Sequence, residues 1–379
     1  MGIRGGLPPK KNGDVYFKIS VPVFCRWAPE RLSDRHMIPK DLQDVAPARW
    51  WTKTGADSVQ CVLCPRQCRL REGERGFCFI RHNLRGELRT RYGYVSALAI
   101  DPVEKKPLYH FFPGTQALSL GTIGCNLGCV FCQNWGISQP SDPGALHKKY
   151  PPAQVAQSAH ETGCQSVAFT YNEPIVSAEY VLDAANACHQ LGIKTVAVTA
   201  GYISAPARRD FFAVMDAANV DLKSFSEHFY KKLCQAALDP VLDTLRYLRN
   251  ETQVWTEITN LLIPDENDAE DELRRMCDWI LMNLGSEVPV HFSAFHPDFQ
   301  MTRHRPTPPP SVKKARRIAL EAGLRYVYTG NIVDVEGSTT FCHHCRKALV
   351  RRQGYEVVED HLRGHGQCVF CHTRCAGHF

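Results

Sequence analysis

Three cysteines with the spacing C-x3-C-x2-C stand in a glycine-rich stretch of the chain: Cys125, Cys129 and Cys132. Thiolates are the usual ligands of iron–sulfur clusters, and a fully ligated four-iron, four-sulfur cluster takes four of them. Three thiolates therefore suit a cluster in which one iron has no protein ligand. A cluster that only carries electrons has no need of such an iron, whereas a small molecule can bind metal there directly.

The same three cysteines have two other interpretations. A structural zinc ion needs four closed ligands, and the sequence offers no nearby fourth. Three unliganded thiols in a reducing compartment are the simpler alternative. We favour the open cluster because the alternating apolar run at 117–120 predicts a strand that leads into the loop. Gly121, Gly124 and Gly128 then allow the backbone to turn sharply around a bulky group.

A second cysteine group precedes this loop. Its members are spaced x2, x3 and x9: Cys61, Cys64, Cys68 and Cys78. Four thiolates within so short a segment complete a closed site, which suits structural zinc or a fully ligated auxiliary iron–sulfur cluster. Soft thiolate ligands do not distinguish the two. We expect zinc, because a closed site near the edge of the protein has no obvious electron path in the sequence.

A third cysteine group lies in the last part of the chain. Two C-x2-C pairs are separated by twenty-two residues: Cys342 and Cys345, then Cys368 and Cys371. This is the spacing of two zinc knuckles that face each other in a zinc ribbon. Few apolar residues lie between the pairs, so we expect the fold of this module to depend on zinc.

The segments that must position the central loop alternate between strand and helix patterns, which predicts an α/β fold with a parallel sheet or barrel. Strands are expected at 118–122, 166–170, 195–199, 220–222, 254–262, 288–295 and 326–329, and helices at 152–163, 177–192, 205–218, 239–249 and 269–284. About six strand–helix units fit a partial (βα)6 TIM-like barrel. In such barrels chemistry gathers at the carboxyl ends of the strands.

Polar residues follow two of these strands. Asn172 and Glu173 come after the second strand, and Glu173 can accept a hydrogen bond from an ammonium group. Asp221 and Lys223 alternate on one face of an extended segment, so both can point into the barrel mouth. The alternatives are a buried, hydrogen-bonded glutamate and a solvent-facing salt bridge.

Two later strands add further candidates. His291 and His296 lie near the barrel mouth, on and just after the sixth strand. Glu257 lies inside the barrel on the fifth strand, where a carboxylate needs a buried partner.

The central motif CNLGCVFC, with Phe131 before the last cysteine, resembles the signature of radical S-adenosylmethionine (SAM) enzymes. The resemblance is closer to the radical SAM member of the AmmeMemoRadiSam system, a relative of the pyruvate formate-lyase activases, and it covers most of 61–379. It implies that the amino and carboxylate groups of SAM chelate the open iron. One electron then cleaves SAM to a 5′-deoxyadenosyl radical, which abstracts hydrogen from a substrate.

The resemblance also implies which residues contact the cofactor: Phe131, Asn172, Glu173, Asp221, Lys223 and His291. The pair Asn172-Glu173 stands where the activases have Gly-Gly-Glu-Pro, which holds the SAM amino group. The chain departs from the family pattern at Ala200, where an asparagine is usual, and at Ala294, where we would expect an arginine.

Several partners and functions follow from the resemblance. The electron donor would be a flavodoxin or a ferredoxin, and Memo-like and AMMECR-type proteins would act alongside. The substrate, small molecule or protein, stays open, and one alternative is installation of a glycyl radical on a protein. A non-catalytic multi-zinc scaffold or nucleic-acid-binding protein would explain the outer cysteine groups but not the central loop. Such a binder also needs a basic stripe with stacking aromatic residues, which the sequence lacks.

Four regions are expected along the chain: an N-terminal extension at 1–57 with a strand at 14–24, a cysteine-rich segment and connection at 58–116, the barrel at 117–335, and a zinc-ribbon-like module at 336–379. A hairpin is predicted at 85–89 with Gly86 at its turn.

The composition excludes some classes of protein. No apolar run is long enough to cross a bilayer, and the first residues have no apolar signal core, so we expect a cytoplasmic protein. Seventeen cysteines without an export signal favour metal sites over disulfides. The net charge of +6 is modest and spread along the chain. It allows an acidic partner such as an electron donor but does not indicate nucleic acid.

Overall fold

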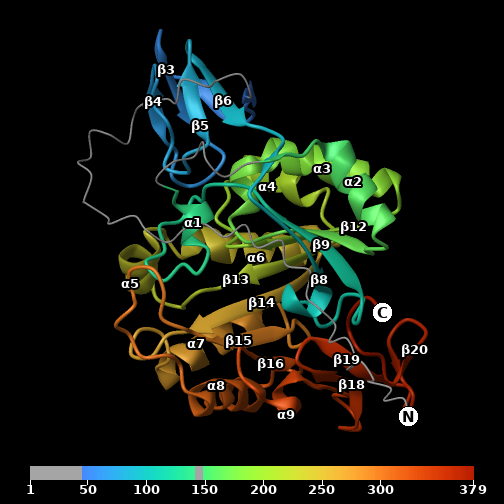
Figure 1. The fold of residues 1–379 in the computed structure, drawn as a ribbon. Helices are drawn as coiled ribbons and strands as arrows, with labels where there is room; N and C mark the ends of the chain where they lie inside the picture. The colour runs from blue at the N-terminus through green and yellow to red at the C-terminus, as the bar shows by residue number, and fades with distance from the viewer. Residues whose placement is uncertain (1–44, 141–147) are drawn as a thin grey trace, which may run out of the picture.

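A computed structural model describes residues 45–140 and 148–379 (Figure 1). Its centre is an eight-stranded sheet in the order β16-β15-β14-β13-β12-β11-β9-β8, parallel except for β8 at one edge. The strands are β8 (Ala97–Pro102), β9 (Gln116–Gly121), β11 (Ser166–Phe169), β12 (Lys194–Thr199), β13 (Ala217–Asp221), β14 (Trp255–Leu262), β15 (Val290–Ala294) and β16 (Val327–Gly330). The predicted α/β fold with a mostly parallel central sheet is confirmed.

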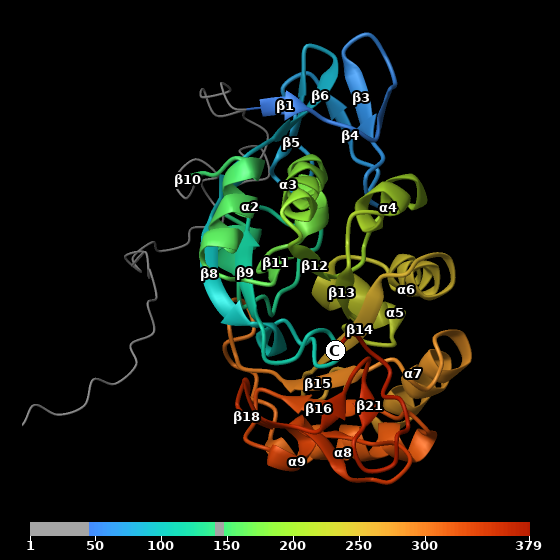
Figure 2. The same cartoon turned by 90° about the vertical axis from the view of Figure 1, so that its right-hand side faces the viewer.

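Helices connect successive parallel strands and lie on the outer face of the curved sheet, as right-handed crossovers require (Figures 1 and 2). They are α2 (Pro152–Glu161), α3 (Ala178–Gln190), α4 (Ala205–Phe212), α6 (Asp239–Glu251), α7 (Glu270–Asn283) and α8 (Pro309–Ala322). Glycines in the left-handed region follow several of them and allow the chain to leave the helix: Gly163, Gly192, Gly285 and Gly323. None of the described helices is both long and apolar enough to cross a membrane.

Two expected boundaries differ from the structure. The helix expected at 205–218 ends at Phe212, because Ala217 and Ala218 already belong to β13. Both alanines are fully buried, and a parallel strand covered on both faces needs no exposed residue. The connection expected at the end of the 58–116 segment contains β8, which pairs with β9 and extends the central sheet.

The first described residues form two small antiparallel sheets at the top of Figure 1. Their strands are β1 (Val45–Pro47), β2 (Trp51–Lys53), β3 (Ser58–Cys61), β4 (Arg69–Arg71), β5 (Arg81–Leu84) and β6 (Glu87–Arg91). The predicted hairpin is confirmed, with Arg85 and Gly86 at positive φ in the two-residue turn between β5 and β6. Residues 45–57 pair with the cysteine-rich segment through β1 and β2, whereas the strand expected at 14–24 lies outside the described residues.

The last residues form a module beside the far edge of the central sheet, at the bottom of Figure 1. It contains α9 (Val335–Ser338), β17 (Thr340–Phe341), β18 (Ala348–Gln353), β19 (Glu356–Asp360), β20 (Leu362–Arg363) and β21 (Gln367–Cys368). Leu349 and Val350 of β18 are fully buried and share one apolar cluster with Tyr109 and Tyr328 of the barrel. The module is therefore packed onto the barrel and does not rely on its own small interior.

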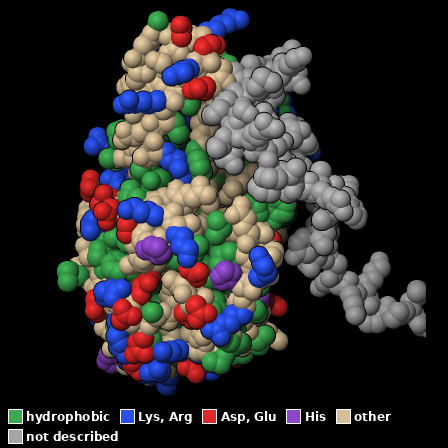
Figure 3. All heavy atoms as spheres, turned by 90° about the vertical axis from the view of Figure 1, so that its left-hand side faces the viewer, with side chains coloured by type: hydrophobic (Ala, Val, Ile, Leu, Met, Phe, Trp, Pro, Cys, Tyr) green, Lys and Arg blue, Asp and Glu red, His purple; other side chains and the backbone are tan. Residues whose placement is uncertain are grey.

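Shorter elements complete the described structure: β7 (Tyr94–Val95), η3 (Val103–Lys105), α1 (Trp135–Ser138), β10 (Lys148–Lys149), η4 (Pro174–Ser177), α5 (Glu227–Phe229) and η5 (Tyr230–Cys234). On the face of the described residues that Figure 3 shows, basic and acidic side chains intermingle over the lower part of the molecule. The spread of charge expected from the sequence is thus visible on this face.

Candidate cluster and cofactor site

The cysteine loop begins where β9 ends and is held in place by one side chain of the next strand's end. The side-chain oxygen of Asn172 accepts a hydrogen bond from the Thr122 N–H (2.9 Å). Its NH2 group donates to the Thr122 hydroxyl (3.0 Å) and to the Gly124 carbonyl (2.8 Å). Asn172, which the resemblance assigns to SAM, thus has its amide engaged with the loop backbone.

The other side of the loop rests on η5, a single π-helical segment. The Gly128 N–H donates to the Cys234 carbonyl (2.9 Å), and the Val130 N–H donates to the Leu233 carbonyl (2.9 Å). A Cβ atom at Gly128 would lie 2.7 Å from the end of the Gln235 side chain, so a larger residue here would displace that side chain. This support could not be predicted, because residues 230–234 carry no recognisable motif.

Phe131 points into the protein core. It is buried, and its ring centroid lies 5.8 Å from that of Phe229. The structure therefore shows a packing contact for Phe131, while its expected contact with the cofactor stays a prediction.

The three thiols of the loop lie too far apart to share one ion. Among the described residues, only Cys342, Cys345, Cys368 and Cys371 bring three or more His, Cys, Asp or Glu ligand atoms within 4.8 Å of one another. A tetrahedral zinc ion needs such close ligands, whereas the ligands of an iron–sulfur cluster bind separate irons. Cys125, Cys129 and Cys132 therefore fit a cluster better than zinc.

Burial favours the protonated form of the thiols in the cysteine loop. Burial raises the pKa of Cys125 well above its usual range, and the neighbouring Glu173 raises it further. A hydrogen bond with Cys234 and burial raise the pKa of Cys129, which Lys223 opposes. Buried thiolates of this kind need bound cations to stay charged, which iron supplies.

Glu173 is buried beside Cys125 with its carboxylate fixed from several sides. It accepts hydrogen bonds from the Thr199 hydroxyl (2.6 Å), the Ala200 N–H (2.7 Å) and the Ile175 N–H (3.2 Å). Burial raises the pKa of Glu173 to about 7, although these hydrogen bonds oppose the shift. The carboxylate is thus held rigidly next to the loop.

Asp221 and Lys223 stand at the end of β13 and both line the central cavity. The Lys223 ammonium lies 2.9 Å from an Asp221 carboxylate oxygen. Burial would lower the pKa of Lys223, but Asp221 and the thiols of Cys129 and Cys234 outweigh burial and raise it. Lys223 therefore stays a cation, close to both the cysteine loop and the cavity.

The central cavity has an empty volume of about 810 Å³, including its open mouth. Residues at the ends of β13 to β16 line it, together with Glu104, Tyr109 and Tyr355. Tyr355 comes from the turn between β18 and β19, so the C-terminal module contributes to the wall of the cavity. This contribution could not be predicted from residue spacing.

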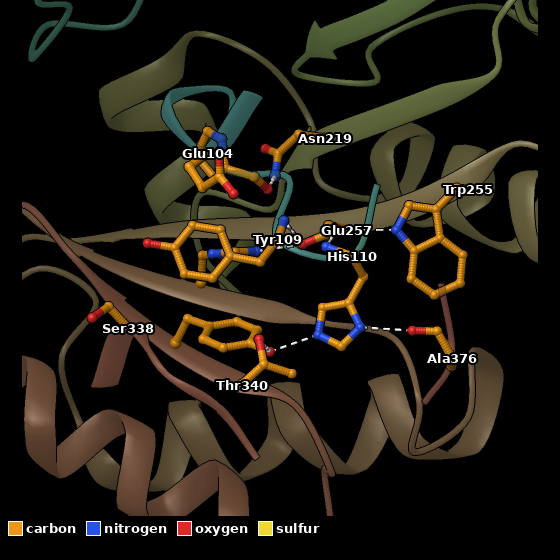
Figure 4. A network of polar contacts seen from close by, with 12 residues as sticks. Glu104, Tyr109, His110, Asn219, Trp255, Glu257, Ser338, Thr340 and Ala376 are labelled. Carbon is orange, nitrogen blue, oxygen red and sulfur yellow. Dashed lines mark hydrogen bonds and ion pairs between the residues drawn. The ribbon is translucent and has the colours of Figure 1, made fainter. Parts of the chain in front are cut away.

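His291 lines the same cavity and is fixed by Glu257, which has the buried partner that its position predicted. The His291 Nε2 lies 2.6 Å from one Glu257 oxygen. Glu257 also accepts hydrogen bonds from the N–H groups of Tyr109 (3.0 Å) and His110 (2.8 Å) and from the Trp255 indole (3.0 Å), as Figure 4 shows in part. Burial raises the pKa of Glu257, but the hydrogen bond from His291 and the nearby histidine charges lower it overall.

A second part of this network joins the barrel to the C-terminal module (Figure 4). The His110 Nδ1–H donates to the Ala376 carbonyl (2.6 Å), and the Tyr328 hydroxyl lies 2.6 Å from Nε2 of His110. The Tyr328 hydroxyl also lies 2.9 Å from that of Thr340. Arg352 donates to the Thr340 hydroxyl (3.0 Å).

The four C-terminal cysteines form a compact site. The Sγ atoms of Cys342 and Cys371 lie 3.6 Å apart, and those of Cys345 and Cys368 lie 3.8 Å apart. Four thiolates around one zinc at about 2.3 Å are about 3.8 Å from one another in a tetrahedron. The group can therefore hold zinc, as predicted from its spacing. The N-terminal cysteines instead line a cavity of their own.

Comparison with protein families and relatives gives the following similarities. The family model for the radical SAM superfamily matches residues 120–277. An uncharacterized protein of Methanocaldococcus jannaschii is 41% identical over 306 residues, which cover 80% of this chain and 91% of that protein. The pyruvate formate-lyase 1-activating enzyme of Escherichia coli strain K12 is 23% identical over 178 residues, which cover 46% of this chain and 71% of the enzyme.

Solved structures include a radical SAM methyltransferase from Sphaerobacter thermophilus, with a TM-score of 0.47 and 15% identity. The alignment covers 77% of this chain and 79% of that one. A domain of a pyruvate-formate lyase-activating enzyme from Bacteroides vulgatus has a TM-score of 0.39 and 18% identity, and the alignment covers 44% of this chain and 99% of that one.

Proposed function

The chain belongs to the radical SAM superfamily, and we propose that it cleaves SAM reductively to start hydrogen abstraction from a substrate in the central cavity. The observation that carries this proposal is the loop of Cys125, Cys129 and Cys132, whose thiols are too widely spaced for one ion and lie beside buried, charged strand ends. When bound, a reduced four-iron cluster supplies the electron that cleaves SAM.

The residues around the loop have separate roles in this proposal. The three cysteines hold the cluster, and Asn172 positions the loop that carries them. Glu173 offers a buried carboxylate to the SAM ammonium, and Asp221 with Lys223 contacts SAM at the end of β13. His291, with its ring fixed by Glu257, faces the cavity in which the substrate is bound.

Two candidates exist for the substrate and the partner proteins. The finer resemblance to the AmmeMemoRadiSam enzyme favours action alongside Memo-like and AMMECR-type proteins, with electrons from a flavodoxin or ferredoxin. The similarity to an activating enzyme of pyruvate formate-lyase supports a second candidate, installation of a glycyl radical on a protein partner. Adding each kind of partner to the reduced enzyme with SAM separates the two, since only the second gives a glycyl-radical signal in electron paramagnetic resonance (EPR).

The test of the cleavage proposal is formation of 5′-deoxyadenosine. The protein is reconstituted anaerobically with iron and sulfide, reduced with dithionite and supplied with SAM. The wild type should form 5′-deoxyadenosine, and the variant with Cys125→Ala, Cys129→Ala and Cys132→Ala should form none. Cys164→Ala removes a buried thiol that lies outside all three cysteine groups and should leave the reaction unchanged. Equal rates in the triple variant and the wild type would refute the assignment.

A further inference from the structure

The four N-terminal cysteines surround a common cavity. Cys61, Cys64, Cys68 and Cys78 all line it, and its empty volume, including space open to solvent, is about 330 Å³. Gly76 stands between two of the thiols, because a Cβ atom there would lie 3.8 Å from the Sγ atoms of both Cys68 and Cys78. The four side chains therefore converge on a space and not on one another.

The spacing of these thiols differs from that of the C-terminal group. The C-terminal thiols approach to 3.6 and 3.8 Å, as a single zinc ion requires. No three of the N-terminal thiols lie within 4.8 Å of one another, since the C-terminal group alone meets that limit among the described residues. Four thiolates bound to one ion at about 2.3 Å lie about 3.8 Å from one another, so the N-terminal thiols are too far apart to share an ion.

We propose that Cys61, Cys64, Cys68 and Cys78 bind a second four-iron, four-sulfur cluster, in place of the zinc expected from the sequence. Four cysteines are the full ligand set of such a cluster, and each ligand binds a different iron, which accounts for both the wide spacing and the central space. The guanidinium of Arg81 lines the same cavity and is buried, but it is paired with the Glu179 carboxylate (2.5 Å), so it adds little net positive charge beside the thiols.

The position of this site removes the argument that favoured zinc. Asn126, the neighbour of Cys125 in the cysteine loop, also lines the N-terminal cavity. Arg66, between Cys64 and Cys68 in sequence, donates hydrogen bonds to the carbonyls of Asn126 and Gln235. The N-terminal cysteine segment is thus in direct contact with the cysteine loop. An electron would therefore have only a short distance to travel from a cluster in that segment to a cluster in the loop.

A further contact shows how closely the two segments approach. A Cβ atom at Gly124 would lie 2.1 Å from the Cys78 carbonyl oxygen, so only glycine permits this packing. Ile80 packs with Ile123 and Val176 around the same contact. The cysteine-rich segment therefore packs directly against the cysteine loop and is not isolated at the edge of the protein.

The test is a metal count that does not depend on SAM cleavage. The wild-type protein, reconstituted anaerobically, should contain about eight irons, about eight acid-labile sulfides and about one zinc per chain. About four irons and about two zincs would overturn the proposal. Mössbauer spectra add a check on the same wild-type sample, because added SAM should alter one iron of the loop cluster and leave the second cluster unchanged.

Variants locate the second cluster. The triple variant Cys125→Ala, Cys129→Ala and Cys132→Ala should keep about four irons and should still show the EPR signal of a reduced cluster. Cys68→Ala, which removes a half-buried member of the N-terminal group, should lower the iron content, whereas Cys188→Ala, a buried thiol in α3, should not. A triple variant that folds with zinc and without iron would overturn the proposal, while the proposed function could still hold.

Discussion

Asn172 and Glu173 are neighbours in the chain, yet their side chains make different contacts. Every polar atom of the Asn172 amide is used to hold Thr122 and Gly124 of the cysteine loop. The Glu173 carboxylate is buried next to Cys125 and is held by the end of β12. The first residue therefore shapes the cluster site, and the second places a charge beside it.

This difference predicts two separable phenotypes. Glu173→Gln and Asp221→Asn should weaken SAM binding by about ten- to a hundredfold while iron content holds, because each removes one charge-assisted hydrogen bond of about 1.5–3 kcal/mol. Asn172→Ala should instead lower iron loading, since it releases the loop. Equilibrium binding of SAM and iron content measure the two effects. Unchanged SAM affinity in both carboxylate variants would leave Glu173 and Asp221 with purely structural roles.

His110 gives a prediction about pH. Burial lowers the pKa of His110 to about 4, below the value of about 6.5 for an exposed histidine. The unfolded chain therefore binds a proton that the folded protein excludes as the pH falls from about 6.5 to about 4. Stability should decrease over that range by at most about 1.4 kcal/mol per pH unit from this residue.

The measurement is urea unfolding at several pH values for the wild type, His110→Gln and His160→Gln. His160 is exposed on α2 and serves as the control. The wild type and the control should lose stability in parallel as the pH falls, and His110→Gln should show a flatter dependence. Identical slopes for all three proteins would show that His110 already carries a proton in the fold.

Among the elements, the cysteine loop is the one whose support is least visible in the sequence. The loop itself, the strand before it and the strand-end residues could be predicted, because cysteine spacing and apolar periodicity are local signals. The supports from η5 and Arg66 could not, since they depend on contacts between residues far apart in the chain. The edge strand β8 was not predicted for the same reason. Its strand conformation depends on pairing with β9 and not on the residues of β8 themselves.

A matched pair of glycine variants tests the contact between the loop and the N-terminal segment. Gly124→Ala and Gly192→Ala both place alanine at positive φ, which destabilises by about 1 kcal/mol or more. Only Gly124→Ala also creates a clash, since nothing lies within 4 Å of a Cβ atom at Gly192. Gly124→Ala should therefore lose iron from the loop, and Gly192→Ala should lose stability alone. Equal iron content in the two variants would show that the contact is not needed for loading.

At the scale of the whole molecule, a buried ion pair joins the barrel to the C-terminal module. Arg352 of β18 and Glu104 are both fully buried, with their nearest charged atoms 3.4 Å apart. Arg352 also donates to the Tyr109 carbonyl (2.8 Å) and the Ser338 carbonyl (3.2 Å). The module therefore completes the wall of the cavity, to which Tyr355 and Glu104 both contribute.

Removing one member of this ion pair should strongly destabilise the folded protein. Arg352→Met leaves Glu104 buried without its cation and should lower the free energy of unfolding by about 3–5 kcal/mol. Arg351→Met is the matched control, because the adjacent Arg351 pairs with Glu359 at the surface, where ion pairs contribute about 0–1 kcal/mol. Chemical denaturation compares them. Similar losses in both variants would mean that the buried pair does not anchor the module.

The arrangement of the modules was only partly predictable. The parallel sheet and the zinc-type spacing of the C-terminal cysteines were confirmed, since each rests on a repeated local pattern. The sequence did not show that the C-terminal module shares a core with Tyr109 and Tyr328, nor that the N-terminal cysteines enclose a cavity beside Asn126. Both are consequences of how distant segments pack, which residue spacing does not encode.

The central claim is that the loop of three cysteines leaves one iron open for SAM. Electron–nuclear double resonance on the reduced protein tests it directly, with SAM isotopically labelled at the amino nitrogen and the carboxylate oxygen. We predict couplings from both labels to the cluster in the wild type and their loss when Cys125, Cys129 and Cys132 are replaced by alanine. A cluster that is fully loaded and reduced, with SAM bound but with neither coupling, would contradict the claim.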